Sequence, residues 1–287
     1  MAQVHGMNGG EGPLSYAQNS SYQGAVMDVV KPIIEEEITK KLDMRQFASN
    51  GFMDSFWIAD FGCSTGLNSF LANKQNFNQK DVPKAVTDPT CQAWNKGDVH
   101  YVGARQEVYD AYSSQYAKDI ELFLKARAQE LVSGGLMALV VPAIPTKFDY
   151  SNPSYKEKIP LYHVGSILVD MAKKGRLDEA KIGSFNFPTY FTFPEELKEI
   201  IERNGSYSIE RMEILDNPGK YASTNAHARA LLFRAISGEL LTNHFGCEII
   251  NELFDRYTQK LEASPALLLP ENDKTIIIFV LLKRRVE

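Results

Sequence analysis

Apolar residues recur at intervals of three and four in five long stretches of the chain, which is the spacing of one buried helix face. Pro32 lies inside the first stretch and is expected to kink the helix or divide it in two. Gly175 and Gly205 end two of the stretches as C-terminal caps, and Gly246 is expected to break the last one. Helices are predicted over residues 20–42, 104–132, 164–175, 193–205 and 230–261.

Four shorter stretches are continuously apolar or alternate between apolar and polar residues, which favours β-strands. Strands are predicted over residues 56–61, 136–142, 207–215 and 274–285. Mixed with the helices, they indicate an α/β fold with an added helical portion. A doubly wound sheet usually has about six strands, yet residues 73–98 are too short and too polar to supply more strands with their crossovers. The sheet is therefore expected to be incomplete.

The composition limits the class of protein. Among 287 residues, 31 are basic and 36 acidic, and the net charge of −5 argues against the basic stripe of a nucleic-acid-binding protein. No apolar run reaches the ~18 residues of a membrane span, and the first residues lack the pattern of a secretory signal. Cys63, Cys91 and Cys247 are scattered, so neither a disulfide framework nor a zinc site is expected. We therefore expect a cytoplasmic protein whose partners include neither nucleic acid nor a membrane.

The stretch FWIADFGCSTGLNSF, residues 56–70, raises the first functional question, because a buried strand ends there at Asp60 and turns through two glycines. Ligands of open α/β sheets bind just beyond the carboxyl ends of the strands. A phosphate-binding loop would need a lysine after Gly66, a dinucleotide site would need another glycine spacing, and the other motifs of a protein kinase are absent. A turn of the type E/D-x-G-x-x-x-G, which binds S-adenosylmethionine, fits residues 60–66. An ordinary buried strand and turn is the alternative.

Several motifs together resemble the SABATH family of plant methyltransferases, which use S-adenosylmethionine to methylate carboxyl groups or ring nitrogens of small metabolites. The most specific are MNGGEGPLSYAQNSSYQ (residues 7–23) and IADFGCSTGLNSF (residues 58–70). Further similar stretches are WNKG (94–97), ARAQELVSGGLM (126–137), SFNFPTY (184–190) and LLTNHFG (240–246). The resemblance covers nearly the whole chain. It implies a Rossmann-like class I methyltransferase sheet with a helical portion that caps the substrate.

The chain departs from the family in lacking a long central segment. In the family that segment holds the second to fourth strands, an acidic residue at the cofactor ribose, a Ser-Phe pair at the adenine and an aromatic wall for the substrate. Here residue 70 runs almost directly into the later stretch VPKAVTDPTCQAWNKG (82–97). The resemblance thus implies an omission of residues or a deletion or splice product, with an incomplete cofactor site. The alternative to an active enzyme is an inactive or truncated member that binds a ligand or pairs with an intact subunit.

The resemblance also implies the binding residues. Gln23 matches the residue that donates a hydrogen bond to the substrate carboxylate. Leu161 stands where salicylate-type members place a tryptophan, which favours an aliphatic or bulkier acid over a flat benzoate. The Asp60 carboxylate suits the ammonium group at the methionine end of the cofactor. The cofactor-binding positions are Tyr16, Ser20, Asp60, Gly62 and Asn68.

The reaction that the resemblance implies is in-line methyl transfer to the carboxylate of a small plant metabolite, which gives a methyl ester. A carboxylate is already ionised at pH 7, so no catalytic acid or base is expected. Catalysis would come from alignment and from the exclusion of water. His163 lies in a helix that is expected to line the pocket, but a single histidine there is more often structural.

A magnesium site is conceivable from the family but is not expected here. Asn95, Phe185 and Asn186 match positions that some members place near a magnesium ion. Gly183, however, stands where those members have an acid, and a hard cation prefers carboxylate oxygens. The cofactor expected is therefore S-adenosylmethionine, with a small carboxylic acid as substrate and a second copy of the chain as partner in a homodimer.

Three parts of the chain are expected. Residues 1–145 form the cofactor-binding α/β part with an N-terminal arm. Residues 146–262 form the mostly helical portion that caps the substrate, and residues 263–287 form a C-terminal strand that returns to the sheet.

Asp60 gives the first testable prediction. Asp60→Asn should weaken the binding of S-adenosylmethionine by about 1.5–3 kcal/mol, the scale of a hydrogen bond to a charged group. Isothermal titration calorimetry with S-adenosylmethionine measures this difference directly. An unchanged dissociation constant would remove Asp60 from the cofactor site.

Overall fold

The structure is a computed structural model that describes residues 12–15, 17–41, 82–147, 156–157, 159–222 and 225–286. The expected strand at 56–61 and its glycine turn lie outside these residues.

The sheet has three strands in the described part of the chain. These are β1 (Leu136–Ala143), β2 (Tyr207–Asp216) and β3 (Ile276–Arg284), in the order β1-β3-β2. The C-terminal strand β3 is antiparallel to both neighbours, so β1 and β2 run parallel to each other. Three of the four predicted strands are therefore confirmed, and the α/β fold class with them.

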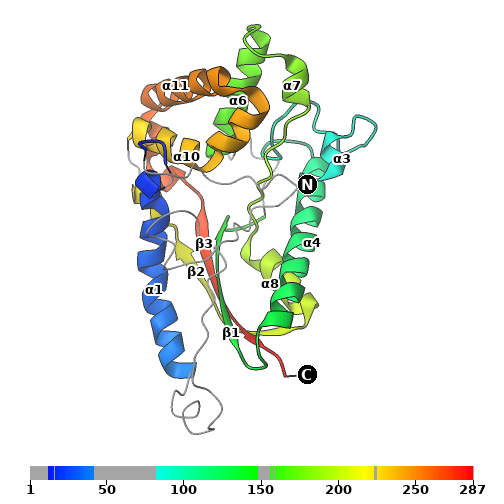
Figure 1. Cartoon of the computed structure of the whole chain (residues 1–287), viewed down its shortest axis with the longest axis vertical. Coiled ribbons are helices and arrows are strands. Elements are labelled where there is room, and N and C mark those ends of the chain that lie inside the picture. The colour runs from blue at the N-terminus through cyan, green and yellow to red at the C-terminus, as the bar shows by residue number, and fades with distance from the viewer. Residues whose placement is uncertain are drawn as a thin grey trace.

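Helices flank this sheet on both faces and cover one end of it (Figure 1). The long helix α1 lies on one face, α4 and α8 lie on the other, and α6, α10 and α11 gather at the end. The longer helices are α1 (Ser21–Lys41), α4 (Gln106–Glu130), α6 (Pro160–Lys173), α8 (Pro194–Asn204), α10 (Ala226–Phe245) and α11 (Cys247–Ala263). The short ones are η1 (Ala17–Asn19), α3 (Lys84–Thr87), α7 (Glu179–Gly183), α9 (Gly219–Ala222), η3 (Pro265–Leu268) and η4 (Pro270–Asn272).

The predicted helices all occur, and two of their ends follow from glycine chemistry. Gly205 ends α8 with a φ of 74°, and Gly246 separates α10 from α11 with a φ of 94°, a region that favours glycine. Of the two outcomes expected at Pro32, the division of the helix does not occur, because α1 continues through this residue as one helix. Pro32 and Asp28, whose carbonyl loses its helical partner, are both exposed, so water can solvate that carbonyl.

Strand β3 is buried on both faces, which explains its uninterrupted apolar sequence. Alternate side chains point to opposite faces of a strand. One set therefore packs against α1 through Val26 and Val30, and the other joins the main core with α4 and α8. The sets are Ile277, Phe279 and Leu281 on the α1 face, and Ile278, Val280 and Leu282 on the main-core face.

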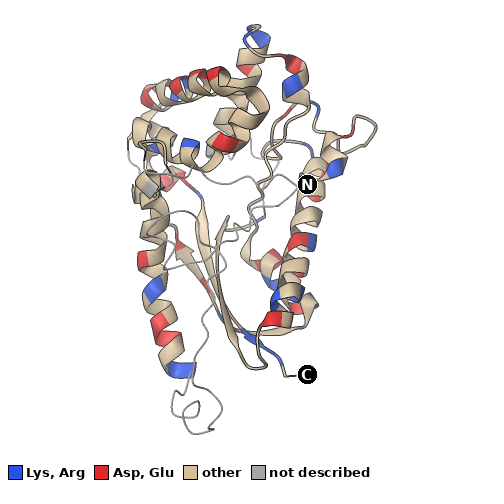
Figure 2. Cartoon of the chain, viewed as in Figure 1, with Lys and Arg blue, Asp and Glu red and all other residues tan. Residues whose placement is uncertain are grey.

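Ion pairs fasten the second half of α1 to β2. Arg211 Nη1 lies 2.8 Å from a carboxylate oxygen of Glu36 and 2.8 Å from one of Glu37. Lys41 Nζ lies 2.8 Å from Glu210, which sits at a β-bulge where β2 has no ladder partner in β3. Hydrogen bonds from Arg211 and then Lys40 lower the pKa of Glu36 to about 2. Figure 2 shows charges of both signs along this stretch of α1.

None of the helices among the described residues is long and apolar enough to span a membrane.

His100 is a buried histidine in the loop before α4. Its ring meets the edge of Tyr162 at 6.3 Å between centroids, and a Cβ on Gly165 of α6 would come within 2.9 Å of its Nε2. Its Nδ1 is buried and has no hydrogen-bond partner among the described residues. Burial lowers the pKa of His100 to about 3, so the ring is neutral near pH 7.

This burial predicts an acid-sensitive fold. Below its ordinary pKa of 6.5, the unfolded state binds a proton at His100 that the folded state does not. Stability therefore falls as pH falls, by about 2 kcal/mol between pH 7 and pH 5 from this group. His100→Gln should remove that part of the slope. Urea unfolding measured across this range tests it, with the exposed His227→Gln as control. Equal slopes for both variants would contradict the prediction.

Candidate functional site

The N-terminal arm folds into a turn directly before α1. Ser15 donates its backbone N–H to the carbonyl of Gly12 at 2.8 Å. Asn19 closes the turn, because its Nδ2 donates to the carbonyls of Pro13 and Ser15, each at 2.8 Å. Asn19 was not singled out from the sequence, since nothing in its spacing shows that it clamps the arm. Tyr16 lies outside the described residues.

Gln23 presents an unsatisfied polar atom at the start of α1. Its Oε1 is buried and has no hydrogen-bond partner among the described residues. Leaving such a group unpaired costs about 1–3 kcal/mol, so the position suits a polar ligand. The backbone N–H groups of the first helical turn have no intrahelical acceptors, and a helix N-terminus favours negative charge. Ser20, which precedes the helix, is half-buried, and its carbonyl accepts the N–H of Gly24 at 2.9 Å.

Two residues of α6 come from the sequence predictions. Leu161 is buried in the main core. His163 is also buried, and its Nε2 lies 2.6 Å from the carbonyl of Glu157, while its Nδ1 has no partner among the described residues. The pKa of His163 lies below its ordinary value, mainly because the ring is buried. The imidazole is thus neutral near pH 7 and one of its nitrogens is engaged with the backbone.

The structure brings together Asn95, Phe185 and Asn186 from two distant motifs. Asn95 Nδ2 lies 2.6 Å from Asn186 Oδ1, 2.8 Å from the Asp98 carbonyl and 3.1 Å from the His100 carbonyl. Both asparagines are buried. Phe185 packs within an aromatic group made up of Phe187, His244 and Phe245.

These contacts do not fit a magnesium ion. The Asn186 amide oxygen already accepts from Asn95, and Phe185 offers only its ring and backbone to the site. No cluster of three or more His, Cys, Asp or Glu side chains suited to a metal occurs within the described ranges. Magnesium prefers oxygen ligands in octahedral geometry, with carboxylates among them. Asn95 and Asn186 therefore form a neutral hydrogen-bonded junction between loops, and Phe185 packs beside it through its ring.

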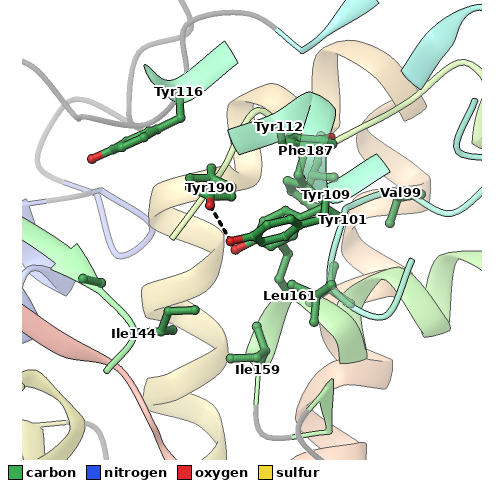
Figure 3. Close-up of a cluster of buried hydrophobic side chains, with 14 of the residues drawn as sticks. Val99, Tyr101, Tyr109, Tyr112, Tyr116, Ile144, Ile159, Leu161, Phe187 and Tyr190 are labelled. Carbon is green, nitrogen blue, oxygen red and sulfur yellow. Dashed lines mark hydrogen bonds between the residues drawn. The ribbon is translucent and has the colours of Figure 1, made fainter. Parts of the chain in front are cut away.

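A cluster of buried tyrosines, which includes Tyr109, Tyr116 and Tyr190, lies beside the carboxyl end of β1 (Figure 3). Ala143 bridges to Thr192, and near it the Glu196 carboxylate accepts hydrogen bonds from Ser113, Thr192 and Tyr190 at 2.5, 2.8 and 2.9 Å. The Tyr190 and Tyr109 hydroxyls lie 2.8 Å apart, and because the single Tyr190 proton is donated to Glu196, Tyr109 donates to Tyr190.

The sequence did not single out this group, because its members are spread over three segments. The pKa of Tyr109 is raised to about 12, mainly by burial, so its hydroxyl stays neutral at physiological pH. The Tyr116 ring packs against the Tyr190 ring, with 5.1 Å between their centroids. The Tyr116 hydroxyl is buried without a partner among the described residues. Because ligands of α/β sheets bind at the carboxyl ends of strands, this cluster borders the expected ligand region.

Three further predicted cofactor residues, Asp60, Gly62 and Asn68, lie outside the described residues. Of the predicted site residues, the structure therefore places Ser20 and Gln23 at the N-terminal end of α1 and Leu161 on α6. It places Asn95 in the junction with Asn186. The arm and α10 are in contact through η1.

Comparisons with known proteins agree with this arrangement. A family model described as "SAM dependent carboxyl methyltransferase" matches residues 2–79 and 78–285. Loganic acid O-methyltransferase of Catharanthus roseus is 31% identical over 356 residues, which cover 99% of this chain and 95% of that protein. Farnesoic acid carboxyl-O-methyltransferase of Arabidopsis thaliana is 30% identical, covering 89% and 92% of the two chains.

A solved structure, "Loganic acid methyltransferase with SAH", matches the fold with a TM-score of 0.87 and 30% identity. The match covers 98% of this chain and 99% of the other.

The expected interruption is visible in the same comparisons. The alignment with the Catharanthus protein extends over 356 residues, at least 69 more than the 287 of this chain. The two matches to the family model meet at residues 78–79, close to the junction at 70–80 where the central segment was expected. With the fold, the arm and the two-part match in agreement, the chain belongs to the SABATH family of S-adenosylmethionine-dependent carboxyl methyltransferases.

Proposed function

We propose that this chain serves the methylation of a small carboxylic acid to its methyl ester, with Gln23 holding the acid. The observation that carries the proposal is the half-buried Gln23 at the N-terminus of α1, whose buried amide oxygen has no hydrogen-bond partner among the described residues. The oxygen and nitrogen ends of an amide exchange by a half-turn of the side chain. The NH₂ end can therefore donate to a carboxylate, and the helix N-terminus favours the same negative charge.

The residues that would hold the cofactor are those that the resemblance to the family implies. The Asp60 carboxylate would pair with the ammonium of S-adenosylmethionine, and Asn68 would bind the same methionine end. Tyr16 and Ser20 would contribute from the arm, and Gly62 would let the turn approach closely. When bound, S-adenosylmethionine supplies an electrophilic methyl group on a positively charged sulfur.

The chain needs no general base for this reaction. A carboxylic acid with an ordinary pKa near 4 is ionised at pH 7, so the arm has only to orient it and exclude water. His163 is neutral there and engages the Glu157 carbonyl, which supports a structural role for its ring.

Leu161 supports a substrate with more bulk than a benzoate. A leucine is smaller than the tryptophan of salicylate-type members, so the same position encloses less of a flat ring. Two relatives are named as methyltransferases of loganic acid and of farnesoic acid. We propose an aliphatic or bulky acid, recognised by the helical portion 146–262, while residues 1–145 and 263–287 form the cofactor side.

The second candidate is an inactive family member that binds ligand or pairs with an intact subunit. The observation that favours it is the alignment, in which at least 69 positions have no residue of this chain. In the family this segment carries cofactor contacts, and each lost charge-assisted contact is worth about 1.5–3 kcal/mol.

Gln23 tests the acid-binding role. Gln23→Ala should raise KM for the acid, or weaken its binding, by about tenfold, the scale of a hydrogen bond to a charged group. Cofactor affinity should stay nearly unchanged, because the proposed contact is with the acid alone. Steady-state kinetics and calorimetry, both on the chain with its central segment restored, separate the two effects. An equal loss of cofactor binding would place Gln23 in the cofactor site or in the fold.

The central segment tests whether the short chain is an enzyme. The chain as it stands should be poorly soluble and show little or no methyl transfer, because unpaired strand edges promote aggregation and cofactor contacts are lost. A version with the family's segment inserted between residues 70 and 80 should bind cofactor and methylate. Transfer of a radiolabelled methyl group to a panel of aromatic and aliphatic acids compares both versions. Robust turnover by the short chain would contradict this expectation and exclude the inactive candidate.

A further inference from the structure

The first turn of α1 is held by Tyr22, the residue next to Gln23. The Tyr22 ring lies flat against Gly219 at the start of α9. A Cβ built on Gly219 would meet three ring atoms of Tyr22 at 2.5, 2.5 and 2.6 Å, distances that real Cβ atoms do not show. The φ of Gly219 is not positive, so the close approach of the Tyr22 ring, and not the backbone conformation, explains why a glycine fits there.

A buried asparagine completes the contact. Asn217 Nδ2 donates to the Tyr22 hydroxyl and, at 2.8 Å, to Thr275 Oγ1 just before β3. Its Oδ1 accepts the backbone N–H of Gly219 at 3.0 Å. The fully buried amide of Asn217 thus links α1, α9 and Thr275, which lies just before β3.

The same network of hydrogen bonds continues to α10. Thr275 Oγ1 donates to Asp273 Oδ1 at 2.6 Å, and Arg229 of α10 lies 3.3 Å from the other carboxylate oxygen of Asp273. Arg229 and Asp273 are both nearly buried, where a charge is costly unless it is paired. The position of Tyr22 is therefore set by elements far from it in sequence.

We propose that Tyr22 is a positioning residue, which fixes the first turn of α1 through Gly219 and Asn217 and so orients Gln23 and Ser20 towards the ligands. The inference rests on the proposed function of Gln23. Neighbours along a helix turn away from each other by about 100°. With Tyr22 fixed on α9, Gln23 therefore points in a defined different direction.

Amide hydrogen exchange tests the contact without any ligand. Gly219→Ala should displace the ring and speed exchange in residues 20–26 by about tenfold, within the range for residues in contact. Exchange in α11 should stay the same. Gly183→Ala is the matched control, because a Cβ on this helical glycine meets nothing within 4 Å.

A double-mutant cycle makes the test specific. Once Tyr22→Ala has removed the ring, adding Gly219→Ala should change exchange by less than about twofold, since the clash no longer exists. Equal effects of Gly219→Ala with and without the ring would overturn the inference. If Gly219→Ala does not fold, Tyr22→Phe and Tyr22→Ala still decide it. The first keeps the ring and should exchange more slowly in residues 20–26 than the second; equal rates would overturn the inference.

Ligand binding then separates the inference from the proposed function. Calorimetric titration with benzoate and hexanoate, on the chain with its central segment restored, should show weaker acid binding for Gly219→Ala and Gln23→Ala alike. A loss for Gln23→Ala alone would overturn the positioning role of Tyr22. No loss for either variant, with faster exchange in Gly219→Ala, would overturn the proposed role of Gln23 while the Tyr22 contact stands.

Discussion

The burial of β3 on both of its faces is the constraint on which the described architecture depends. Fully burying an aliphatic or aromatic side chain contributes about 1.5–3 kcal/mol, and β3 buries six in alternation. The same strand thereby holds α1 on one side and the α4 and α8 layer on the other (Figure 1). Because α1 carries Gln23 at its first turn, the position of the proposed acid-binding residue depends on packing that begins at the opposite end of the chain.

Much of this fold could be predicted from the sequence, because long periodic segments carry their own signal. The apolar run at 274–285 and the glycines at 205 and 246 predicted β3 and the helix ends, and the structure confirms them. The break considered at Pro32 does not occur, and local sequence could not exclude it, since it cannot show that packing and ion pairs hold α1 on either side of this residue. The four-residue helices α3 and α9 are too short to show a period.

Only those parts of the site that belong to recognised sequence motifs could be predicted. The similarity of two motifs suggested that Asn95 and Asn186 belong together, and the structure joins them at 2.6 Å, although by a hydrogen bond between amides. Spacing says nothing of Tyr22 and Asn217, which are 195 residues apart and meet only through the tertiary fold. That the Gln23 oxygen has no partner among the described residues is likewise a property of its surroundings, which a sequence pattern does not encode.

The two ends of α1 are held by different physics, and this has a consequence for how the helix responds to ionic strength. Near its C-terminal end, Arg211, Glu36 and Lys41 are partly exposed, and added salt screens such pairs, over ~8 Å at physiological concentration. Near its N-terminal end, the Tyr22 and Asn217 contact joins neutral groups, which dissolved ions do not screen. Concentrated salt should therefore loosen the last turns of the helix while the first turn, with Gln23, keeps its place.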